Sequence, residues 1–228
     1  MKHAGKAGRA AVRMIYTALV VVLGLIFVGA LARLLGHLVA EAAGLLLGLW
    51  AVFALFCVWF FRDPQPRVPR DADAIVAPAH GKVDVVDEIE EPSFLGGRCR
   101  RVSIFLSIFD VHVQYAPVAG RIVLRRHTAG QFLNAMRTDS ARFNENVLIG
   151  IESAERPDER IGVRLIAGLI ARRIVPWVQE GDQVARGERI SLIRFGSRVD
   201  LYLPPGYEVV VRPGDRVRGG ETIVARRT

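Results

Sequence analysis

Two long apolar runs stand near the start of the chain. Residues 14–32 and residues 42–61 contain no charged side chain, and only the stretch RLLGHLVAE separates them. Each run has about the 20 residues that a helix needs to cross the hydrocarbon core of a membrane. We therefore expect a transmembrane helical hairpin over residues 14–61, behind a basic segment of residues 1–13. A cleaved signal peptide has one short apolar region, so the second run argues against it; a pair of buried core helices is the alternative.

Basic residues flank the outer ends of this predicted hairpin. Four precede the first run and three follow the second: Lys2, Lys6, Arg9, Arg13, Arg62, Arg67 and Arg70. The connecting stretch balances Arg33 with Glu41. Because basic residues beside a span stay on the cytoplasmic side, we expect both ends of the hairpin and the rest of the chain on that side. Residues 59–61, WFF, would form an aromatic belt at the interface.

The pattern changes after the second run. The stretch FRDPQPRVPRD contains three Pro, which cannot continue a helix, and predicts an extended linker over residues 62–75. Beyond it, short runs rich in Val and Ile are broken by Gly, Pro and Asp at close spacing, which is typical of a compact all-β unit. We therefore expect one β domain over residues 76–228.

Two short patterns recur within this predicted β domain. GDQVARGERI begins at Gly181 and GDRVRGGETI begins at Gly214, while APAHGKV begins at Ala77 and APVAGRI begins at Ala116. Gly-Asp favours a tight turn, after which Val and Ile form the next short strand. The signatures resemble the biotinyl/lipoyl carrier fold, a flattened β-barrel of two quasi-repeated halves. The predicted fold is therefore mainly β, with a biotinyl/lipoyl-like barrel behind a two-helix transmembrane hairpin.

The charge and cysteine content narrow the possible partners. The formal net charge is +8, but the basic residues are scattered and not interleaved with aromatic side chains, so we expect no nucleic-acid partner. On an anchored chain, attraction to anionic membrane lipids explains the charge better. Cys57 and Cys99 are isolated and predict neither a disulfide framework nor a metal site.

The hairpin tip between the repeats raises a chemical question. Carriers of the biotinyl/lipoyl type hold their prosthetic group there on a Lys, but this chain has Lys only at positions 2, 6 and 82. The stretch RFGSRVD places Gly196-Ser197 at the corresponding point. A Ser hydroxyl can attack the preceding carbonyl to give an ester, and elimination followed by hydrolysis then leaves a pyruvoyl group. Such a ketone-like carbonyl can react with an amine and accept electrons.

The ordered set of motifs makes a specific resemblance. FFRDP, the APAxGKV stretch, SIFDVHVQYAPVAG, GVRLIAGLIARRIV and RFGSRVDLYLP together resemble the short proenzyme type of phosphatidylserine decarboxylase. The resemblance implies self-cleavage between Gly196 and Ser197, a covalent pyruvoyl group made from Ser197, and a large chain 1–196 bound to a small chain 197–228. It also implies conversion of phosphatidylserine to phosphatidylethanolamine and carbon dioxide. A non-enzymatic membrane-tethered adaptor and a decarboxylase of another serine lipid are the alternatives.

The resemblance also points to other site residues. It implicates His112 in catalysis, and we expect it to exchange a proton with the substrate carbon. Asp110, two residues earlier and thus on the same face if both lie on one strand, would orient or polarise His112. Arg172 and Arg173 are candidates to pair with the phosphate or carboxylate of the substrate. Alternation along a strand would point only one of these two arginines at the site.

The sequence departs from the family pattern at two places, of which the first concerns self-cleavage. Family members usually read PADG where this chain reads PAHG, so His80 replaces an Asp thought to assist the base. Imidazole can act as a base near neutral pH, which predicts cleavage by a modified route, with slow or absent cleavage as the alternative. The stretch FNENV also carries Asn146 where the family usually has Arg.

Overall fold

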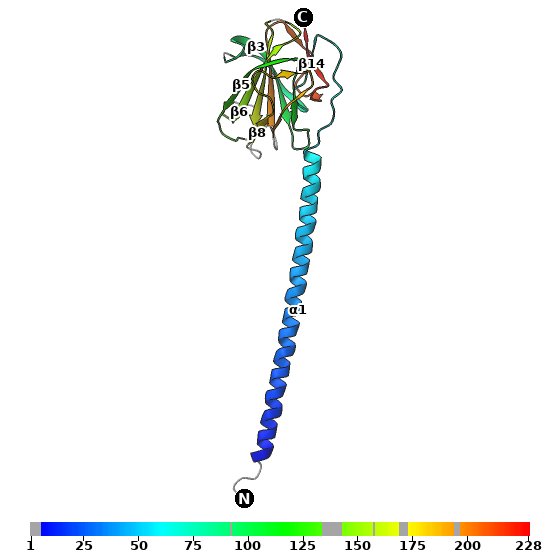
Figure 1. Ribbon diagram of the computed structural model, residues 1–228, viewed down its shortest axis with the longest axis vertical. Coiled ribbons are helices and arrows are strands. Elements are labelled where there is room, and N and C mark those ends of the chain that lie inside the picture. Colours follow the sequence, from blue (N-terminus) through cyan, green and yellow to red (C-terminus); the bar gives the residue numbers. More distant parts are fainter. Residues whose placement is uncertain (1–5, 92, 134–142, 157, 169–172, 194–196) are drawn as a thin grey trace. The chain divides into compact units, whose positions relative to one another are not determined.

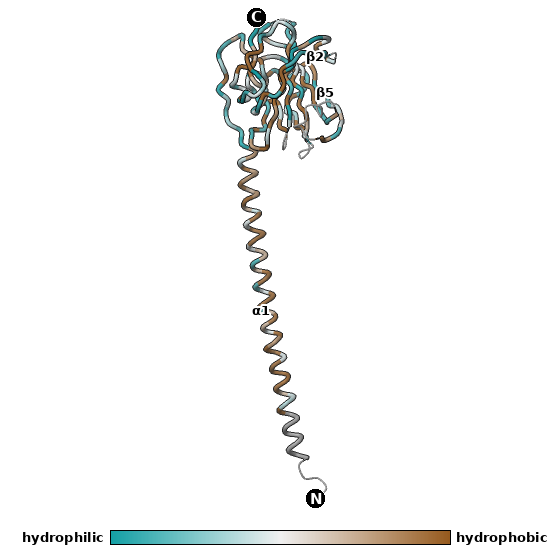
Figure 2. The backbone as a smooth tube through the Cα atoms, turned by 180° about the vertical axis from the view of Figure 1, so that it is seen from behind, coloured by the Kyte–Doolittle hydropathy of each residue, from teal (hydrophilic) through white to brown (hydrophobic). Residues whose placement is uncertain are grey.

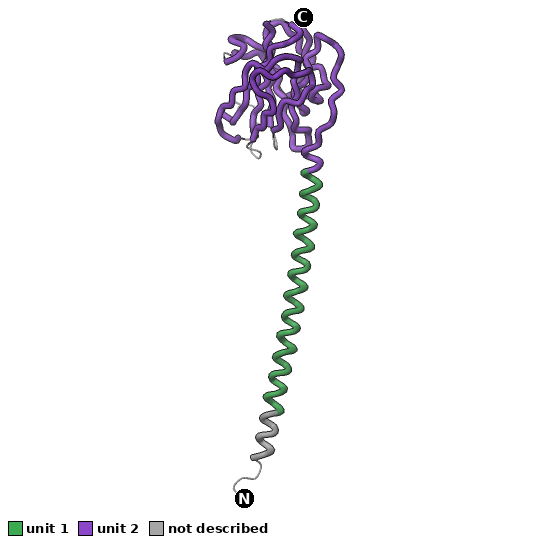
Figure 3. Tube along the Cα trace, in the orientation of Figure 1, with its two compact units in different colours: residues 1–57 green, residues 58–228 purple. Residues whose placement is uncertain are grey.

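The chain forms two compact units. The computed structural model describes residues 6–91, 93–133, 143–156, 158–168, 173–193 and 197–228. One unit comprises residues 1–57 and the other residues 58–228 (Figure 3).

One long helix replaces the hairpin that the sequence predicts. Helix α1 (Lys6–Phe60) runs without a break through the stretch that separates the two apolar runs. That stretch contains no Pro and a single Gly, and one Gly costs a helix only about 1 kcal/mol relative to Ala. The predicted hairpin is therefore not confirmed. From Ile15 to Phe60 the helix is long and apolar enough to cross a membrane (Figure 2).

The segment predicted as a linker packs against the β unit. Its last residues already belong to a strand, β1 (Ala74–Val76). Asp63 forms an ion pair with Arg189 at 2.7 Å, and the backbone N–H of Arg67 donates to Glu221 at 3.1 Å. Pro66 is buried. This segment therefore forms part of the domain surface.

The structure describes fourteen strands in three sheets (Figure 1). The largest sheet has the order β13-β2-β3-β11-β7-β6-β5-β9 and curls into an open half-barrel. Its strands are β2 (Gly81–Glu91), β3 (Gly97–Leu106), β5 (Gly120–Thr128), β6 (Asn146–Ser153), β7 (Arg160–Ala167), β9 (Gln183–Val184), β11 (Ser197–Leu203) and β13 (Arg216–Val217). The two smaller sheets are β1-β14-β12 and β4-β10-β8, formed by β1, β4 (Val113–Tyr115), β8 (Ile174–Pro176), β10 (Arg189–Ile193), β12 (Tyr207–Val209) and β14 (Ile223–Arg227).

The sheet is open where the sequence predicts a closed, flattened barrel. In the described part of the chain, β13 and β9 stand at its two edges and each pairs with one neighbour. The biotinyl/lipoyl-like form of the barrel is therefore not confirmed, although the mainly β fold is.

The internal repeat reappears at these two edges. β13 pairs with the first residues of β2, and β9 pairs in the same way with the first residues of β5. The turns that precede β9 and β13 place Gly181 and Gly214 at φ values of 97° and 108°, which Gly adopts without strain. The two repeats therefore form quasi-equivalent edges of one sheet.

Strand β11 occupies the middle of the large sheet. It pairs with β3 on one side and β7 on the other, so both rows of its backbone groups are hydrogen-bonded. Val199, Leu201 and Leu203 are buried in the main core, and Ser197 points to the same face because strand residues alternate. The first residue of this strand therefore lies inside the fold.

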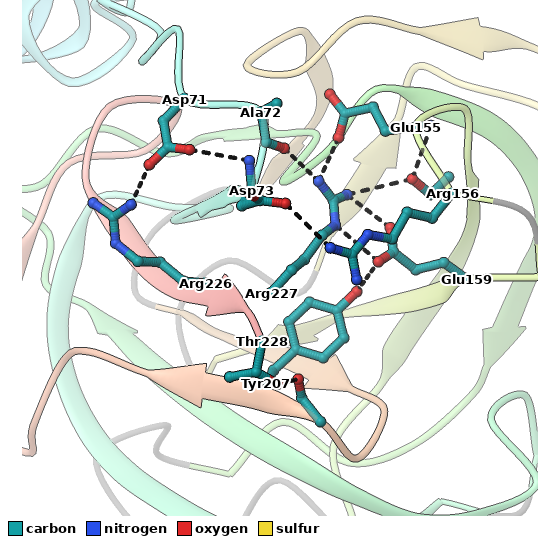
Figure 4. A network of polar contacts seen from close by, with 12 residues as sticks. Asp71, Ala72, Asp73, Glu155, Arg156, Glu159, Tyr207, Arg226, Arg227 and Thr228 are labelled. Atoms are coloured by element: carbon teal, nitrogen blue, oxygen red, sulfur yellow. Dashed lines mark hydrogen bonds and ion pairs between the residues drawn. The ribbon is translucent and has the colours of Figure 1, made fainter.

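A buried ionic network holds the last strand in place (Figure 4). The guanidinium of Arg227 in β14 bonds both carboxylate oxygens of Glu159 at 2.8 and 2.7 Å, and it bonds Glu155 at 2.7 Å. The carbonyl of Ala72 accepts a further bond from Arg227 at 2.5 Å. Burial alone would raise the pKa of Glu159, but hydrogen bonds from Arg227 and Tyr207 lower it. The carboxylate of Glu159 therefore stays ionised against Arg227.

Replacing Arg227 should destabilise the protein far more than replacing its neighbour. Arg227→Ala leaves Glu159 buried without its counter-charge, and breaking such a pair costs about 3–5 kcal/mol. Arg226→Ala removes a half-exposed pair with Asp71 and should cost at most about 1 kcal/mol. Denaturant unfolding of both variants in detergent measures the two losses. Equal losses would contradict the assigned role of Arg227.

Candidate active site

Ser197 begins the central strand of the sheet. It pairs with Leu106 of β3 and Ala167 of β7 and is fully buried. Its Oγ has no hydrogen-bond partner among the described residues. A buried hydroxyl without a partner is costly in a purely structural role, so this position fits a reacting group. Gly196 lies outside the described residues.

The strand register brings one end of the sheet together around Ser197. Lys82 of β2 and Arg198 of β11 both pair with Phe105 of β3. One residue closer to this end of the sheet, Gly81, Leu106 and Ser197 therefore lie side by side across the three strands. Neighbouring strands are about 4.8 Å apart, which places Gly81 about 10 Å from Ser197. Residues just before β2 and just after β3 therefore gather at the end where β11 starts.

Gly81 is required at this point by its backbone. Its φ of 154° suits Gly, and a Cβ would lie 2.2 Å from the carbonyl oxygen of Phe105. The chain therefore passes closer to β3 here than any other residue would allow.

His112 lies directly before β4 and is almost completely buried. Its Nδ1 lies 2.9 Å from the backbone carbonyl of Asp110. A carbonyl oxygen can only accept, so Nδ1 carries the hydrogen and Nε2 is the basic nitrogen. The backbone carbonyl of His112 accepts bonds from Gln114 Nε2 at 2.7 Å and from the N–H of Ile193 at 3.1 Å. The imidazole is thus held in one tautomer and one orientation.

The environment keeps His112 neutral. The ring of Phe60, at the end of α1, lies 4.3 Å from the imidazole between ring centroids. Burial lowers the pKa of His112 to about 4, although the carbonyl and charge of Asp110 act in the opposite direction. The imidazole is therefore in its base form at physiological pH, with Nε2 unprotonated.

Asp110 acts on His112 from a turn and not, as the sequence predicted, from a shared strand. Asp110 lies in a turn after β3, not on a strand, and its carboxylate accepts bonds from the N–H and Oγ of Ser107 at 2.9 and 2.7 Å. An Asp that closes a turn in this way uses its side chain locally. Asp110 orients His112 through its backbone carbonyl.

His80 lies directly before Gly81, at the same end of the sheet. Its ring stands edge-on to Tyr115 with centroids 5.7 Å apart. Its Nε2 is buried and has no hydrogen-bond partner within the described residues. Burial lowers the pKa of His80, and the negative charges of Glu221 and Asp110 oppose this shift. The described fold thus brings both predicted histidines to the end where Ser197 begins β11.

A cavity of about 420 Å³ opens beside His80. Three of the residues that line it are arginines. The lining residues are Arg62, His80, Gly81, Asp110, Val111, Arg216, Val217 and Arg218. Of the two predicted substrate arginines, Arg173 is exposed just before β8 and does not line this cavity, and Arg172 lies outside the described residues. Sequence reasoning missed Arg216 and Arg218, which only the pairing of β13 with β2 brings to His80.

Two further buried residues lie near Ser197. The sequence indicated a role for them only weakly or not at all. Asn144, in the unusual FNENV stretch, donates from Nδ2 to the carbonyl of Ala167 at 2.8 Å, and Ala167 pairs with Ser197. Arg198 forms an ion pair with Asp84 at 2.5 Å beneath the sheet. Both contacts fix the strand ends that surround the candidate nucleophile.

The side chains in this region suit acid–base and covalent chemistry. Among the residues that the structure describes, no group of three or more His, Cys, Asp and Glu is placed to hold a metal ion. Burial raises the pKa of the Cys99 thiol to about 11, so this thiol stays protonated. Ser197, His112 and His80 supply a hydroxyl and two imidazoles at this end of the sheet that such chemistry can use.

Comparisons with known proteins agree on one family. A sequence profile described as phosphatidylserine decarboxylase matches residues 53–225. The chain is 47% identical to the phosphatidylserine decarboxylase proenzyme of Symbiobacterium thermophilum over 202 residues, which cover 88% of this chain and 92% of the relative. It is 40% identical to the proenzyme of Desulfotalea psychrophila over 203 residues, or 89% and 94% of the two chains. The Gluconobacter oxydans proenzyme is 44% identical over 203 residues, or 87% and 89%.

Removing the ring of Phe60 should raise the pKa of His112. Burial is the main cause of the low value, so Phe60→Ala, which admits water, should move the pKa from about 4 toward 6.5. A titration of ¹⁵N-labelled histidine by NMR measures the shift. Phe109→Ala, which removes an exposed ring from the neighbouring turn, is the control and should leave the pKa unchanged. An unchanged value in Phe60→Ala would refute the shielding role.

Proposed function

The chain belongs to the phosphatidylserine decarboxylase family, and from that premise we propose that it is a membrane-anchored, self-processing, pyruvoyl-dependent enzyme. It converts phosphatidylserine to phosphatidylethanolamine and carbon dioxide. The observation that carries this proposal is Ser197, a fully buried hydroxyl at the start of a central strand in the FGS stretch.

Self-cleavage begins with the hydroxyl of Ser197. Its oxygen attacks the carbonyl of Gly196, and the peptide bond becomes an ester as the nitrogen takes a proton. A base then removes the Cα proton of residue 197, the ester oxygen leaves with the large chain 1–196, and dehydroalanine remains. Addition of water and loss of ammonia give the pyruvoyl group at the start of the small chain 197–228. Each step needs a positioned base, and buried neutral imidazoles supply one.

His80 and His112 divide the proton transfers. His80 stands where the family usually has an Asp linked to the self-cleavage base, and we assign it chiefly to maturation. His112 acts chiefly in turnover, through Nε2. A substrate ammonium must lose a proton before its nitrogen can react, and the basic Nε2 of His112 accepts that proton. The same nitrogen then returns a proton to the substrate carbon after carbon dioxide leaves.

The residues present fit a pyruvoyl group at position 197. Its precursor hydroxyl is buried, at the end of the sheet that also carries both imidazoles and the arginine-lined cavity. When formed, the group supplies an electrophilic carbonyl that holds the substrate amine and accepts electrons from the departing carboxylate. His112 moves protons at Nε2, and Phe60 limits the access of water to that imidazole.

Exposed aromatic side chains bring this region close to a lipid surface. The ring of Phe109, on the turn that precedes His112, is 66% exposed and lies 5.9 Å from the ring of Trp59. Ile108 and Phe61 are also exposed nearby in the chain. Tryptophan and other aromatic rings favour the membrane–water interface. We propose that this turn contacts the interface, where a substrate with acyl chains in the bilayer can reach it, and that the positive charge strengthens attraction to anionic lipids.

The apolar helix is too long for one straight crossing. The segment Ile15–Phe60 has 46 residues, which at 1.5 Å per residue span about 70 Å, against about 30 Å of hydrocarbon core. A straight helix would leave half of this apolar surface in water. We therefore propose that in a bilayer the helix folds back near Gly36, within the more polar stretch of residues 33–41, as a transmembrane hairpin.

Such a hairpin places the β unit on the cytoplasmic side. Basic residues flank both of its ends, and these stay inside. A reporter that is active in the cytoplasm, such as green fluorescent protein, should therefore be active when it is fused after Thr228. Alkaline phosphatase, which is active only in the periplasm, should be inactive at the same position. The reverse pair of signals would contradict this topology.

Three single variants test the proposed reaction in one experiment. Gel analysis follows cleavage while the release of labelled carbon dioxide from serine-labelled lipid follows turnover. Ser197→Ala lacks the attacking hydroxyl and should stay whole and inactive. His112→Ala should still be cut in part but lose turnover by about 10²-fold or more, a typical general acid–base contribution. His80→Asp restores the usual family residue and should be cut as fast as the native chain or faster.

Each variant has a result that contradicts its assignment. Two-chain processing of Ser197→Ala would exclude the pyruvoyl route. Accumulation of uncut His112→Ala would make His112 the base for maturation. Loss of processing in His80→Asp with normal processing in His80→Ala would exclude His80 from maturation.

A further inference from the structure

The two quasi-equivalent edges of the large sheet carry different side chains at three matching positions. The β9 edge has only uncharged side chains there, and the β13 edge has one imidazole and two guanidiniums. The matching residues are Ala119, Gln183 and Ala185 on the β9 edge and His80, Arg216 and Arg218 on the β13 edge. The repeat is thus broken at the residues that line the cavity.

The backbones of the two edges are the same at these positions. The pairs Val184–Gly120 and Val217–Gly81 occupy equivalent places in the sheet. The bonds that close the turns are also duplicated: Gly181 N to Ile122 O and Gly214 N to Val83 O, both at 2.8 Å, and Gly187 N to Ala116 O and Gly220 N to Ala77 O, at 2.8 and 2.9 Å. The fold therefore accepts uncharged residues at the positions of Arg216 and Arg218.

The arginines that line the cavity can bind an anion. The guanidinium of Arg216 lies 3.7 Å from Asp110, and that of Arg218 lies 3.8 Å from Glu221. Both separations exceed hydrogen-bond distance, and both arginine side chains are mostly exposed. With Arg62, three guanidiniums stand against these two carboxylates. The cavity thus keeps an excess positive charge and donors in the fork geometry that matches phosphate oxygens.

We infer that this cavity binds the phosphodiester of a serine phospholipid headgroup through Arg216 and Arg218. The inference rests on the proposed function and names the part of the substrate that this cavity binds. The volume of about 420 Å³ is within the usual range for small-molecule sites.

The distance to Ser197 selects the phosphate over the carboxylate. In the headgroup, phosphorus lies four bonds from the amino nitrogen, or about 5 Å, and a guanidinium carbon lies about 4 Å beyond it. Gly81 on the cavity wall lies about 10 Å from Ser197 and the backbone of β13 about 14 Å, so a guanidinium about 9 Å from the amine is reached when the arginine side chains extend back from β13 toward Ser197. The substrate carboxylate, attached beside the amine, stays near Ser197 and outside the reach of this cavity.

The β9 edge supplies the residues for the test variant. Arg216→Gln with Arg218→Ala copies the β9 edge, where Gln183 and Ala185 occupy the same backbone. In detergent micelles the double variant should be cut between residues 196 and 197 like the native chain. Its KM for phosphatidylserine should rise by about 10- to 100-fold with kcat nearly unchanged, because the lost charge-assisted bonds hold substrate before and during the reaction.

A matched control removes the same charge elsewhere. Arg98→Gln with Arg212→Gln loses two exposed arginines that do not line the cavity. It should keep the native KM. An equal rise in KM in both double variants would overturn the inference, since it would trace the effect to general attraction between the protein and the lipid surface. A native KM in Arg216→Gln with Arg218→Ala would overturn it as well.

A binding measurement separates this inference from the proposed reaction. Uncut Ser197→Ala, which cannot turn over, is titrated with glycerophosphoserine and with inorganic phosphate by ³¹P NMR. Glycerophosphoserine should bind to Ser197→Ala. The triple variant that also carries Arg216→Gln and Arg218→Ala should bind it about tenfold or more weakly. This result would support the cavity even if the native protein released no carbon dioxide. Binding of inorganic phosphate alone, or equal binding by both proteins, would refute a headgroup site.

Discussion

The position of strand β11 between β3 and β7 is the constraint on which the site depends. Both rows of its backbone groups are paired, so its first residue, Ser197, is fixed and buried without a hydrogen bond from its own side chain to a described residue. A peptide bond just before such a residue can be cut while the strand after it stays in register. The other end of the small chain is held by Arg227 against Glu155 and Glu159. The sheet therefore tolerates the break that its proposed chemistry needs.

Burial at the same end of the sheet sets the proton chemistry. Phe60 closes over His112 and the imidazole stays neutral, with its hydrogen on Nδ1 and its basic nitrogen at Nε2. Because Phe60 is also the last residue of α1, the apolar helix contributes directly to the environment of this histidine. The last residue of α1 is thus in ring contact with His112 within residues 58–228.

Much of the β domain could be predicted from the sequence, because turn chemistry is local. The two Gly-Asp turns and the mainly β content follow from short patterns, and a short pattern also singles out Ser197 as the candidate nucleophile. The helix hairpin could not be settled in this way, since one Gly in a stretch of good helix formers leaves the balance to the bilayer. The sequence could not show that a turn follows β3, in which Ser107 binds the Asp110 carboxylate while the Asp110 carbonyl contacts His112. Arg216 and Arg218 reach His80 only through pairing of strands far apart in the chain, which no local pattern reports.

We propose that this fold cuts itself before Ser197 and converts that residue to a pyruvoyl group. Intact mass spectrometry of the purified native protein tests this proposal. We expect a large chain of residues 1–196 and a small chain of residues 197–228 that is lighter by one ammonia than the unmodified peptide. A single uncut chain of 228 residues, or a small chain that begins with unmodified Ser197, would contradict it.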